Sequence, residues 1–361
     1  MNTFGDKLKL TIFGQSHSAA IGAVLDGLPA GEAVDLEAVR EFMHRRSPGH
    51  SVWATARKED DEPEILGGLV DGVTCGAPLA FRIGNRDAHS QDYAGLRDKP
   101  RPGHADFAAF AKSGAAHDIR GGGQFSGRLT APLCFAGAVA QQILARRGIK
   151  TAAHVYAIAG IPDLPFSGMD DDFPALARAA GKDFPVIDDS AGQKMQTAIM
   201  EAQGDGDSVG GIVEAAAAGL PAGLGEPMFA GVENRLAQIL FGIPAVRGVE
   251  FGAGEFSGFA AAQARGSQHN DEFYCEGGGV RTRTNRHGGA LGGITTGMPL
   301  VVRAAFKPTP SISRPQQTVS LSARTSTELC IKGRHDPCIV PRAVPCVEAA
   351  LAWAALELVL S

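Results

Sequence analysis

The sequence lacks the usual marks of a metal-binding, disulfide-stabilised or membrane-spanning protein. It has six cysteines but no CxxC pair, and Cys338 and Cys346 are too far apart for a standard zinc knuckle. We therefore expect reduced and mostly buried thiols. No run of about 20 apolar residues is present, so we expect no membrane-spanning helix. The N-terminus has no long apolar run, so we expect no signal peptide and a cytoplasmic protein.

The chain also lacks a large excess of charge of either sign. Its net charge of -5 over 361 residues gives no general attraction to nucleic acid or to anionic membranes. Glycine, in contrast, is abundant at 47 residues and follows no collagen period, which predicts many turns and close backbone contacts. Strand and helix patterns interleave without a clean linker. We therefore predict a single α+β domain over residues 1–361 that acts on a small molecule.

Apolar periodicity predicts the main elements of this domain. Residues 8–13 and 21–25 alternate well enough to form a hairpin, and Asp35 is placed to cap a helix that runs to Arg46. Residues 161–190 are rich in Asp and Pro and predict a surface excursion. The other predicted strands cover 64–70, 210–218 and 299–306, and the other predicted helices cover 132–147, 233–241 and 347–360.

One short stretch concentrates residues that bind anions and move protons. It reads Arg101-Pro-Gly-His-Ala-Asp106, followed by Arg120-Gly-Gly-Gly-Gln-Phe-Ser-Gly-Arg128. Glycines let a backbone approach a ligand and point its N–H groups inward, and arginines grip phosphate or carboxylate with two hydrogen bonds. A histidine such as His104 moves protons near neutral pH, and Asp106 is placed to orient it. The stretch predicts a site for an anionic, phosphorylated small molecule.

Three other clusters carry similar chemistry, and each has a plain structural alternative. His17 lies on a turn between two predicted strands, where a histidine is often incidental. The run Gly288–Gly293 and the segment Lys307-Pro-Thr-Pro-Ser311 offer backbone and side-chain donors, or a turn with ordinary surface residues. In Lys332-Gly-Arg-His-Asp-Pro337, Asp336 is either a base held ionised by Arg334 or half of a structural ion pair. No Walker or dinucleotide-binding pattern is present.

In this order and spacing the clusters resemble the chorismate synthase family. The matching segments span nearly the whole chain, and two of them, at 101–106 and 332–337, are particularly specific to that family. They are Gly14-Gln-Ser-His17, Arg45-Arg46, Arg101-Pro-Gly-His-Ala-Asp106, Asp118-Ile-Arg-Gly-Gly-Gly123 with Ser126 and Arg128, Ala245-Val-Arg-Gly248, Gly288 to Gly297, Lys307-Pro308-Thr309 and Lys332-Gly-Arg-His-Asp-Pro337.

The resemblance implies a β-α-β sandwich, assembled as a homotetramer. It implies conversion of 5-enolpyruvylshikimate 3-phosphate to chorismate and phosphate, a trans-1,4 elimination in the shikimate pathway to aromatic amino acids. The family requires reduced FMN although the reaction has no net redox change, and some of its members reduce their own flavin with NADPH. This sequence does not decide between the two modes.

The family's functional residues carry over to numbered positions of this chain. The resemblance implies catalytic roles for His17, which would neutralise the departing phosphate, His104, which would tune flavin protonation, and Asp336, which would help accept a proton through the flavin. It implies substrate binding by Arg46, Arg57, Arg101 and Arg128. It implies FMN binding by Gln124, Phe125, Ser126, Pro244, Ala245, Gly292, Lys307, Pro308, Thr309, Pro310, Ser311 and Arg334.

The chain departs from the usual family motifs at several positions. Gln15 and Ser18 replace Glu and Gly in the first motif, Gln124 and Phe125 replace Arg and Ser after the glycine triplet, and Ser47 and Val52 replace arginines. A lost charged hydrogen bond costs about 1.5–3 kcal/mol, which affects affinity more than fold. Two other functions therefore stay open at the level of sequence: a flavin-binding paralogue with lost or altered catalysis, and a conventional flavin oxidoreductase.

Overall fold

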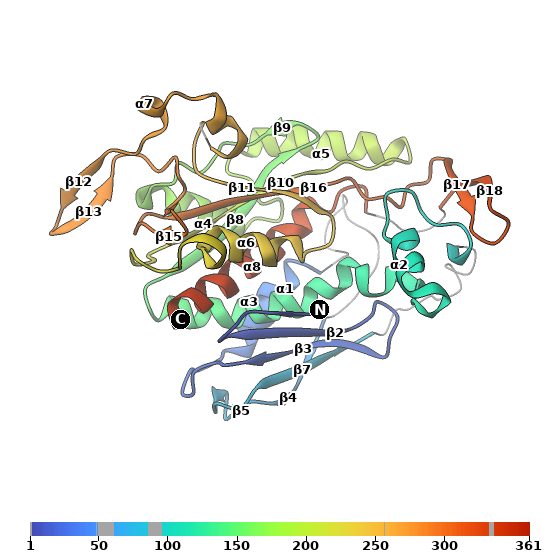
Figure 1. The fold of residues 1–361 in the computed structure, drawn as a ribbon, viewed down its shortest axis with the longest axis horizontal. Coiled ribbons are helices and arrows are strands. Elements are labelled where there is room, and N and C mark those ends of the chain that lie inside the picture. Colours follow the sequence, from blue (N-terminus) through green and yellow to red (C-terminus); the bar gives the residue numbers. More distant parts are fainter. Residues whose placement is uncertain (1, 48, 50–60, 86–95, 256, 332–335) are drawn as a thin grey trace.

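The structure is a computed structural model of the chain. It describes residues 2–47, 49, 61–85, 96–255, 257–331 and 336–361. Figure 1 shows these residues as stacked layers: one sheet, a layer of helices, a second sheet and an outer pair of helices. This is the predicted β-α-β sandwich with additional helices on one face, and the prediction of fold class is confirmed.

The first sheet is antiparallel and has the strand order β1-β2-β3-β7-β4. Its centre is the predicted hairpin, in which Leu10 pairs with Leu25 and Ile12 with Ala23. Residues on one face of the hairpin are buried and those on the other are more exposed, which is why alternation in the sequence found it. The strands are β1 (Thr3–Phe4), β2 (Lys9–Gly14), β3 (Ala20–Asp26), β4 (Pro63–Gly67) and β7 (Leu79–Gly84).

The second sheet has the order β11-β16-β10-β8-β9 and is also antiparallel. The predicted strands at 210–218 and 299–306 are confirmed as β10 and β16, two of its three inner strands. Nearly every residue of both is buried, because helices cover the two faces of this sheet. The strands are β8 (Lys150–Ile158), β9 (Ile161–Pro162), β10 (Gly211–Ala218), β11 (Val246–Phe251) and β16 (Leu300–Phe306).

Four helices fill the space between the sheets, and α3 and α8 form its centre (Figure 1). A Cβ atom on Gly137 of α3 would lie 2.3 Å from the Cα atom of Ala349 on α8, so only glycine allows this close approach. One continuous apolar core includes residues of both sheets and of all four helices. The helices are α1 (Leu36–His44, capped by Asp35 as predicted), α3 (Thr130–Ala145), α6 (Val232–Phe241) and α8 (Val340–Leu360).

Helix α8 differs from the sequence-based expectation in two respects. It begins at Val340, two turns before the predicted start at Val347, and contains Pro345 in its interior. It is also long and apolar enough to cross a membrane, although we expected no such segment. In the structure 89% of its most apolar window is buried inside the protein, so its apolar character serves the core.

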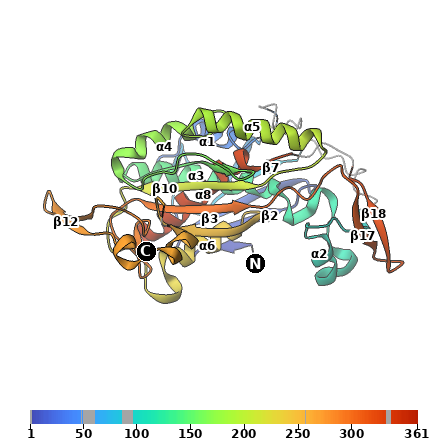
Figure 2. The ribbon, with the colours of Figure 1, turned by 90° about the horizontal axis from the view of Figure 1, so that it is seen from above.

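Residues 161–190 pack as a layer rather than forming the expected surface excursion. Helix α4 (Phe173–Ala180) lies on β8, and α5 (Asp189–Gly204) runs beside it on the outer face of the second sheet (Figure 2). Phe166, Phe173 and Leu176 are buried in a second apolar cluster there. The Asp and Pro residues of the segment occupy its turns and helix starts, which is why composition alone suggested an irregular surface.

Smaller elements lie at the two ends of the layers. Helix α2 and the β17–β18 hairpin lie at one end, and the β12–β13 hairpin at the other (Figures 1 and 2). The smaller elements are α2 (Asp106–Ser113), α7 (Gly266–His269), β5 (Leu69–Val70), β6 (Val73–Thr74), β12 (Phe273–Glu276), β13 (Gly279–Thr282), β14 (Ala290–Leu291), β15 (Ile294–Thr295), β17 (Gln316–Ser320) and β18 (Thr325–Leu329).

The six cysteines are all free thiols, but Cys75, Cys275 and Cys330 are exposed, so the expectation of mostly buried thiols is wrong for half of them.

Candidate functional site

A cavity of about 660 Å³ opens among segments that are far apart in the sequence. Its wall is formed by residues 101–105 before α2, 121–130 at the start of α3, 241–247 after α6, 306–311 after β16 and the first turns of α8. Within the described part of the chain, its charged lining consists of six cations and a single carboxylate. These are Arg46, Arg101, Arg128, Arg247, Lys307, Arg342 and Asp336.

The cavity gathers most of the site residues expected from the sequence. Those that line it are Arg46, Arg101, His104, Gln124, Phe125, Ser126, Arg128, Pro244, Ala245, Lys307, Thr309, Pro310, Ser311 and Asp336. Pro308 and His17 are not in the lining, although each is next to residues that are. Gly292 lies on the β14–β15 turn, toward the β12–β13 end of the molecule, and is not brought to the cavity (Figure 1). Arg57 and Arg334 fall outside the described residues.

The glycine triplet separates the two predicted histidines. Gly121, Gly122 and Gly123 have φ angles of 59°, 84° and 55°, a conformation that side-chain-bearing residues rarely adopt. A Cβ atom on Gly121 would lie 2.3 Å from the His17 ring, and one on Gly122 would lie 3.2 Å from Nε2 of His104. Gly121 and Gly122 therefore leave no room for side chains beside the two imidazoles, and a Cβ atom on Gly123 would lie 2.1 Å from the backbone oxygen of Asp118.

Arg101, His104 and Asp106 form a nearly buried cluster at the cavity wall. Asp106 accepts hydrogen bonds from the backbone N of Arg101 at 3.0 Å, from its Nε at 2.7 Å and from its Nη2 at 2.9 Å. Nδ1 of His104 lies 2.5 Å from Asp106 Oδ1, as expected for an orienting carboxylate. Burial alone would raise the pKa of Asp106, but the hydrogen bonds from Arg101 and His104 lower it well below its ordinary value.

These contacts fix which ring nitrogen of His104 carries the proton. Nδ1 lies near both Asp106, which can only accept, and Nη2 of Arg101, which can only donate, at 3.1 Å. The shorter contact, to a charged acceptor, is the stronger one, so we assign the proton of the neutral ring to Nδ1. Nε2 is then the acceptor nitrogen, and it is the one beside Gly122.

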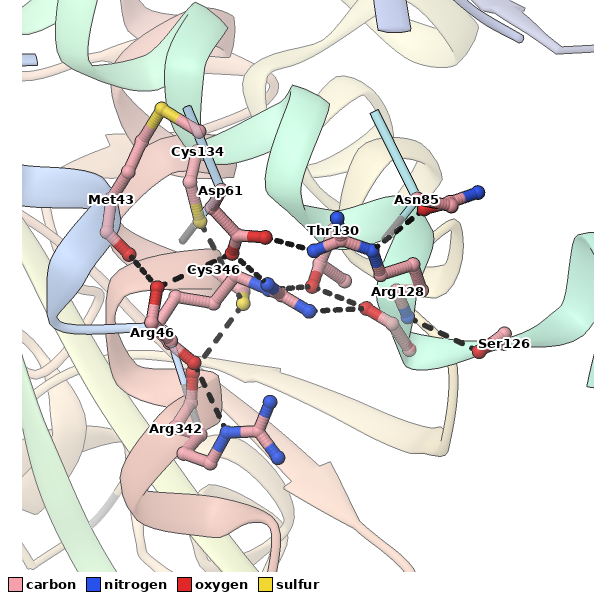
Figure 3. A network of polar contacts seen from close by, with 12 residues as sticks. Met43, Arg46, Asp61, Asn85, Ser126, Arg128, Thr130, Cys134, Arg342 and Cys346 are labelled. Carbon is pink, nitrogen blue, oxygen red and sulfur yellow. Dashed lines mark hydrogen bonds and ion pairs between the residues drawn. The ribbon is translucent and has the colours of Figure 1, made fainter. Parts of the chain in front are cut away.

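A second cluster, shown in Figure 3, joins two of the predicted substrate arginines through a residue that sequence analysis missed. The carboxylate of Asp61 pairs with Nη1 of Arg46 through one oxygen and with Nη1 of Arg128 through the other. All three side chains are buried. Asp61 lies in the acidic run 59–62, so nothing in its sequence context distinguished it from a solvated surface charge.

Asp336 also has a partner that the sequence did not suggest. Its Oδ2 accepts a hydrogen bond of 2.5 Å from Nη1 of Arg342, which lies on the first turn of α8. Nε of Arg342 donates to the backbone oxygen of Arg46 at 3.0 Å, which links this pair to the second cluster (Figure 3). The pairing that we expected with Arg334 lies outside the described residues.

The segment 307–311 offers further donors and lies against residues 101–103, since Nη1 of Arg101 donates to Oγ of Ser311 at 3.3 Å. Burial, with a smaller contribution from Arg247, lowers the pKa of Lys307, whose Nζ donates to the backbone oxygen of Gly103. Oγ1 of Thr309 is buried and has no hydrogen-bond partner among the described residues. A buried hydroxyl of this kind costs free energy unless a ligand or water satisfies it.

The described residues that replace the usual motif residues either make hydrogen bonds near the site or line the cavity. Ser18 closes the turn that carries His17, since its Oγ contacts the backbone oxygens of Gln15 at 2.8 Å and Ala20 at 2.7 Å. Ser47 donates to Asp61 at 3.3 Å. Gln124 and Phe125 line the cavity, and Val52 lies outside the described residues.

Taken together, the cavity defines the class of protein. A cationic cavity with an oriented histidine, a glycine-lined wall and an aspartate is the site of an enzyme that acts on an anionic small molecule. The sandwich of two sheets around α3 and α8 supplies the rigid elements that position it.

Comparison with known proteins gives the family. The model of the chorismate synthase family matches residues 8–360. The chain is 44% identical to the chorismate synthase of Lancefieldella parvula, covering 99% of this chain and 95% of that protein. It is 47% identical to the chorismate synthase of Korarchaeum cryptofilum, covering 97% and 95%. A crystal structure of a chorismate synthase superposes with a TM-score of 0.75 at 28% identity, covering 99% of this chain and 92% of the other.

The chain therefore belongs to the chorismate synthase family, and the resemblance found in its motifs is confirmed. Membership makes it a lyase of the shikimate pathway.

Proposed function

We propose that this chain catalyses the trans-1,4 elimination of phosphate from 5-enolpyruvylshikimate 3-phosphate to give chorismate, with reduced FMN as cofactor. The observation that carries the proposal is the cationic cavity with His104 and the glycine triplet on one wall and Asp336 on another. A substrate with a phosphate and two carboxylates matches an excess of arginine and lysine. His104 and Asp336 are the groups in its lining suited to proton handling.

The described residues fit a phosphorylated cofactor such as FMN. The unpartnered Oγ1 of Thr309 is a buried donor at the cavity wall, and Lys307 and Arg247 place two cations near it. We propose that residues 124–126, Pro244 with Ala245, and residues 307–311 hold the flavin. When bound in its reduced form, FMN supplies electron density that assists loss of the phosphate.

The chain's own residues would bind the substrate and move its proton. Arg46, Arg101 and Arg128 bind its anionic groups with paired hydrogen bonds. Nε2 of His104 is the acceptor nitrogen beside Gly122, so it can take up a proton at the cavity wall. Asp336, kept near Arg342, accepts a proton on its carboxylate.

His17 has a less direct place in this scheme. Its ring lies against Gly121, which lines the cavity, so we propose that it acts on the departing phosphate as a positive charge close to the glycine backbone. Asp118 pairs with Arg120 close by, and the nearby His17 contributes to the lowered pKa of Asp118 after the hydrogen bonds from Arg120.

The decisive experiment is anaerobic turnover with dithionite-reduced FMN, following chorismate formation by absorbance and phosphate release in parallel. We expect both products in equal amounts from the wild-type protein and a loss of turnover in His104→Ala and Asp336→Ala. FMN binding with no product would instead indicate a paralogue with lost or altered catalysis. Sustained NADPH oxidation without chorismate would indicate a flavin oxidoreductase.

Other properties implied by the family complete the proposal. We propose a single-domain, cytoplasmic enzyme that assembles as a homotetramer and binds neither nucleic acid nor membrane. Light scattering at a series of concentrations tests the tetramer. NADPH consumption under anaerobic turnover conditions tests whether the protein reduces its own flavin.

A further inference from the structure

The buried carboxylate of Asp61 has no role in the reaction proposed above. It lies just before β4, with a φ of 41°, which is unusual for a residue with a side chain. Its side chain is 2% exposed and is not part of the cavity lining. The chain therefore keeps a carboxylate behind the cavity wall, at a cost in burial and backbone conformation.

Each of the two arginines that Asp61 contacts also donates a hydrogen bond to another side chain. Nε of Arg46 donates to Oγ1 of Thr130 at 3.0 Å, while its Nη1 pairs with Asp61. Nε of Arg128 donates to Oδ1 of Asn85 at 3.2 Å, while its Nη1 pairs with the other oxygen of Asp61. Both arginines line the cavity. Among the described residues, Asp61 is the one carboxylate that contacts both of them, and it therefore fixes the orientation of both guanidinium groups (Figure 3 shows these contacts).

Asp61 also sets the charge of this part of the wall. Burial alone would raise its pKa, but Arg46 and Arg128 outweigh burial and lower it, so the carboxylate is ionised at neutral pH. Two buried guanidinium groups side by side would otherwise repel each other across a medium of low dielectric constant. With Asp61 between them, these three side chains together carry one positive charge, whereas the two guanidinium groups alone carry two.

We propose that Asp61 is a positioning residue for the anion-binding wall: it orients Arg46 and Arg128 toward one anionic group of the substrate and lowers the positive charge that the pair presents. The orientation gives specific recognition of the substrate, while the reduced charge limits the binding of other anions. The identity of the substrate rests on the proposed function; the effect on small anions does not.

Two variants of Asp61 distinguish the effect of its charge from the effect of its position. In Asp61→Asn the shape is kept but the charge is removed, and the amide nitrogen faces one of the two arginines. In Asp61→Glu the charge is kept but the carboxylate is displaced by one methylene. Glu64→Gln is the matched control, because Glu64 lies on the adjacent strand and pairs with Arg82 at the surface.

Sulfate is the probe for charge, measured by isothermal titration without substrate or flavin. We expect Asp61→Asn to bind sulfate about tenfold more tightly than wild type, because one nearby negative charge has been removed. Asp61→Glu and Glu64→Gln should bind sulfate as wild type does. Wild-type sulfate affinity in a folded Asp61→Asn variant would overturn the charge role.

Steady-state kinetics with reduced FMN is the probe for position. We expect KM for 5-enolpyruvylshikimate 3-phosphate to rise about tenfold in both Asp61 variants, with kcat within about threefold of wild type, because one oriented arginine contact is lost. A wild-type KM in Asp61→Glu would overturn the positioning role, even if Asp61→Asn fails to fold. If wild type has no turnover but sulfate binding changes as expected, the proposed function fails and the charge role of Asp61 stands.

Discussion

The sharpest prediction concerns Asp106→Asn, which removes one charge and leaves the shape of the side chain unchanged. The two oxygens of Asp106 accept four hydrogen bonds, three from Arg101 and one from His104. Asparagine retains one accepting oxygen, so about two of the four are lost. At about 1.5–3 kcal/mol for each hydrogen bond between charged groups, we expect the free energy of unfolding at pH 7 to fall by about 3–5 kcal/mol.

The pH dependence of this effect has a definite sign. The pKa of Asp106 is lowered in the folded protein from an ordinary value of 3.8, so the unfolded chain takes up the proton first as the pH falls. The stabilisation is therefore fully present above about pH 4 and is lost as the pH falls through the folded-state pKa. The difference between variant and wild type should shrink below about pH 4.

Urea denaturation at a series of pH values measures both quantities. Asp98→Asn is the matched control, because Asp98 accepts hydrogen bonds from Ser320 and Ser322 near the surface; it should lose much less stability than Asp106→Asn. In Asp106→Asn kcat should also fall, by about a hundredfold, since Nδ1 of His104 loses the acceptor that fixes its proton. A loss of stability no larger than in the control would show that the cluster is not the buried charge network described above.

Three further outcomes are expected. Gly121→Ala should lower kcat at least about tenfold and lower Tm, because its Cβ would collide with the His17 ring; wild-type kcat and Tm would contradict this. Thr309→Val should leave Tm unchanged and weaken FMN binding about tenfold in fluorescence titration, since the buried hydroxyl lacks a partner among the described residues; unaltered affinity would remove Thr309 from the cofactor site. The buried His154, between Asp163 and Glu214 at 2.9 Å each, has a raised pKa because these carboxylates outweigh burial. Stability in urea should therefore decline as pH rises above about 6.5, and this decline should be absent in His154→Gln.

The parts of the fold that the sequence predicted are those with a strong local pattern. The hairpin of β2 and β3 alternates because one face of the sheet is covered, and Asp35 caps α1 with bonds to the backbone N of Glu37 and Ala38. The start of α8 was predicted too late because Pro345 usually ends a helix, whereas here packing inside the core retains it. The start of α8 is decided by burial in the tertiary structure, which a short stretch of sequence does not reveal.

In the candidate site, too, contacts between residues close in the sequence were predictable, and contacts between distant residues were not. His104 and Asp106 are two residues apart, so their contact was predictable from the sequence. Asp61 was missed because its partners are 14 or more residues away and because the acidic run around it looks like ordinary surface. Arg342 was missed because its contact with Arg46 joins residues 296 positions apart. Only the fold brings these charges to one wall.

The placement of α8 has a consequence for how the protein is made. Every strand of both sheets precedes this helix in the chain, yet its residues are buried between them and pack on α3, β8 and β10. During synthesis the apolar inner faces of these elements therefore stay uncovered until α8 has left the ribosome. The sandwich can therefore close only once α8 itself has been synthesised, and until then the uncovered apolar surface favours aggregation.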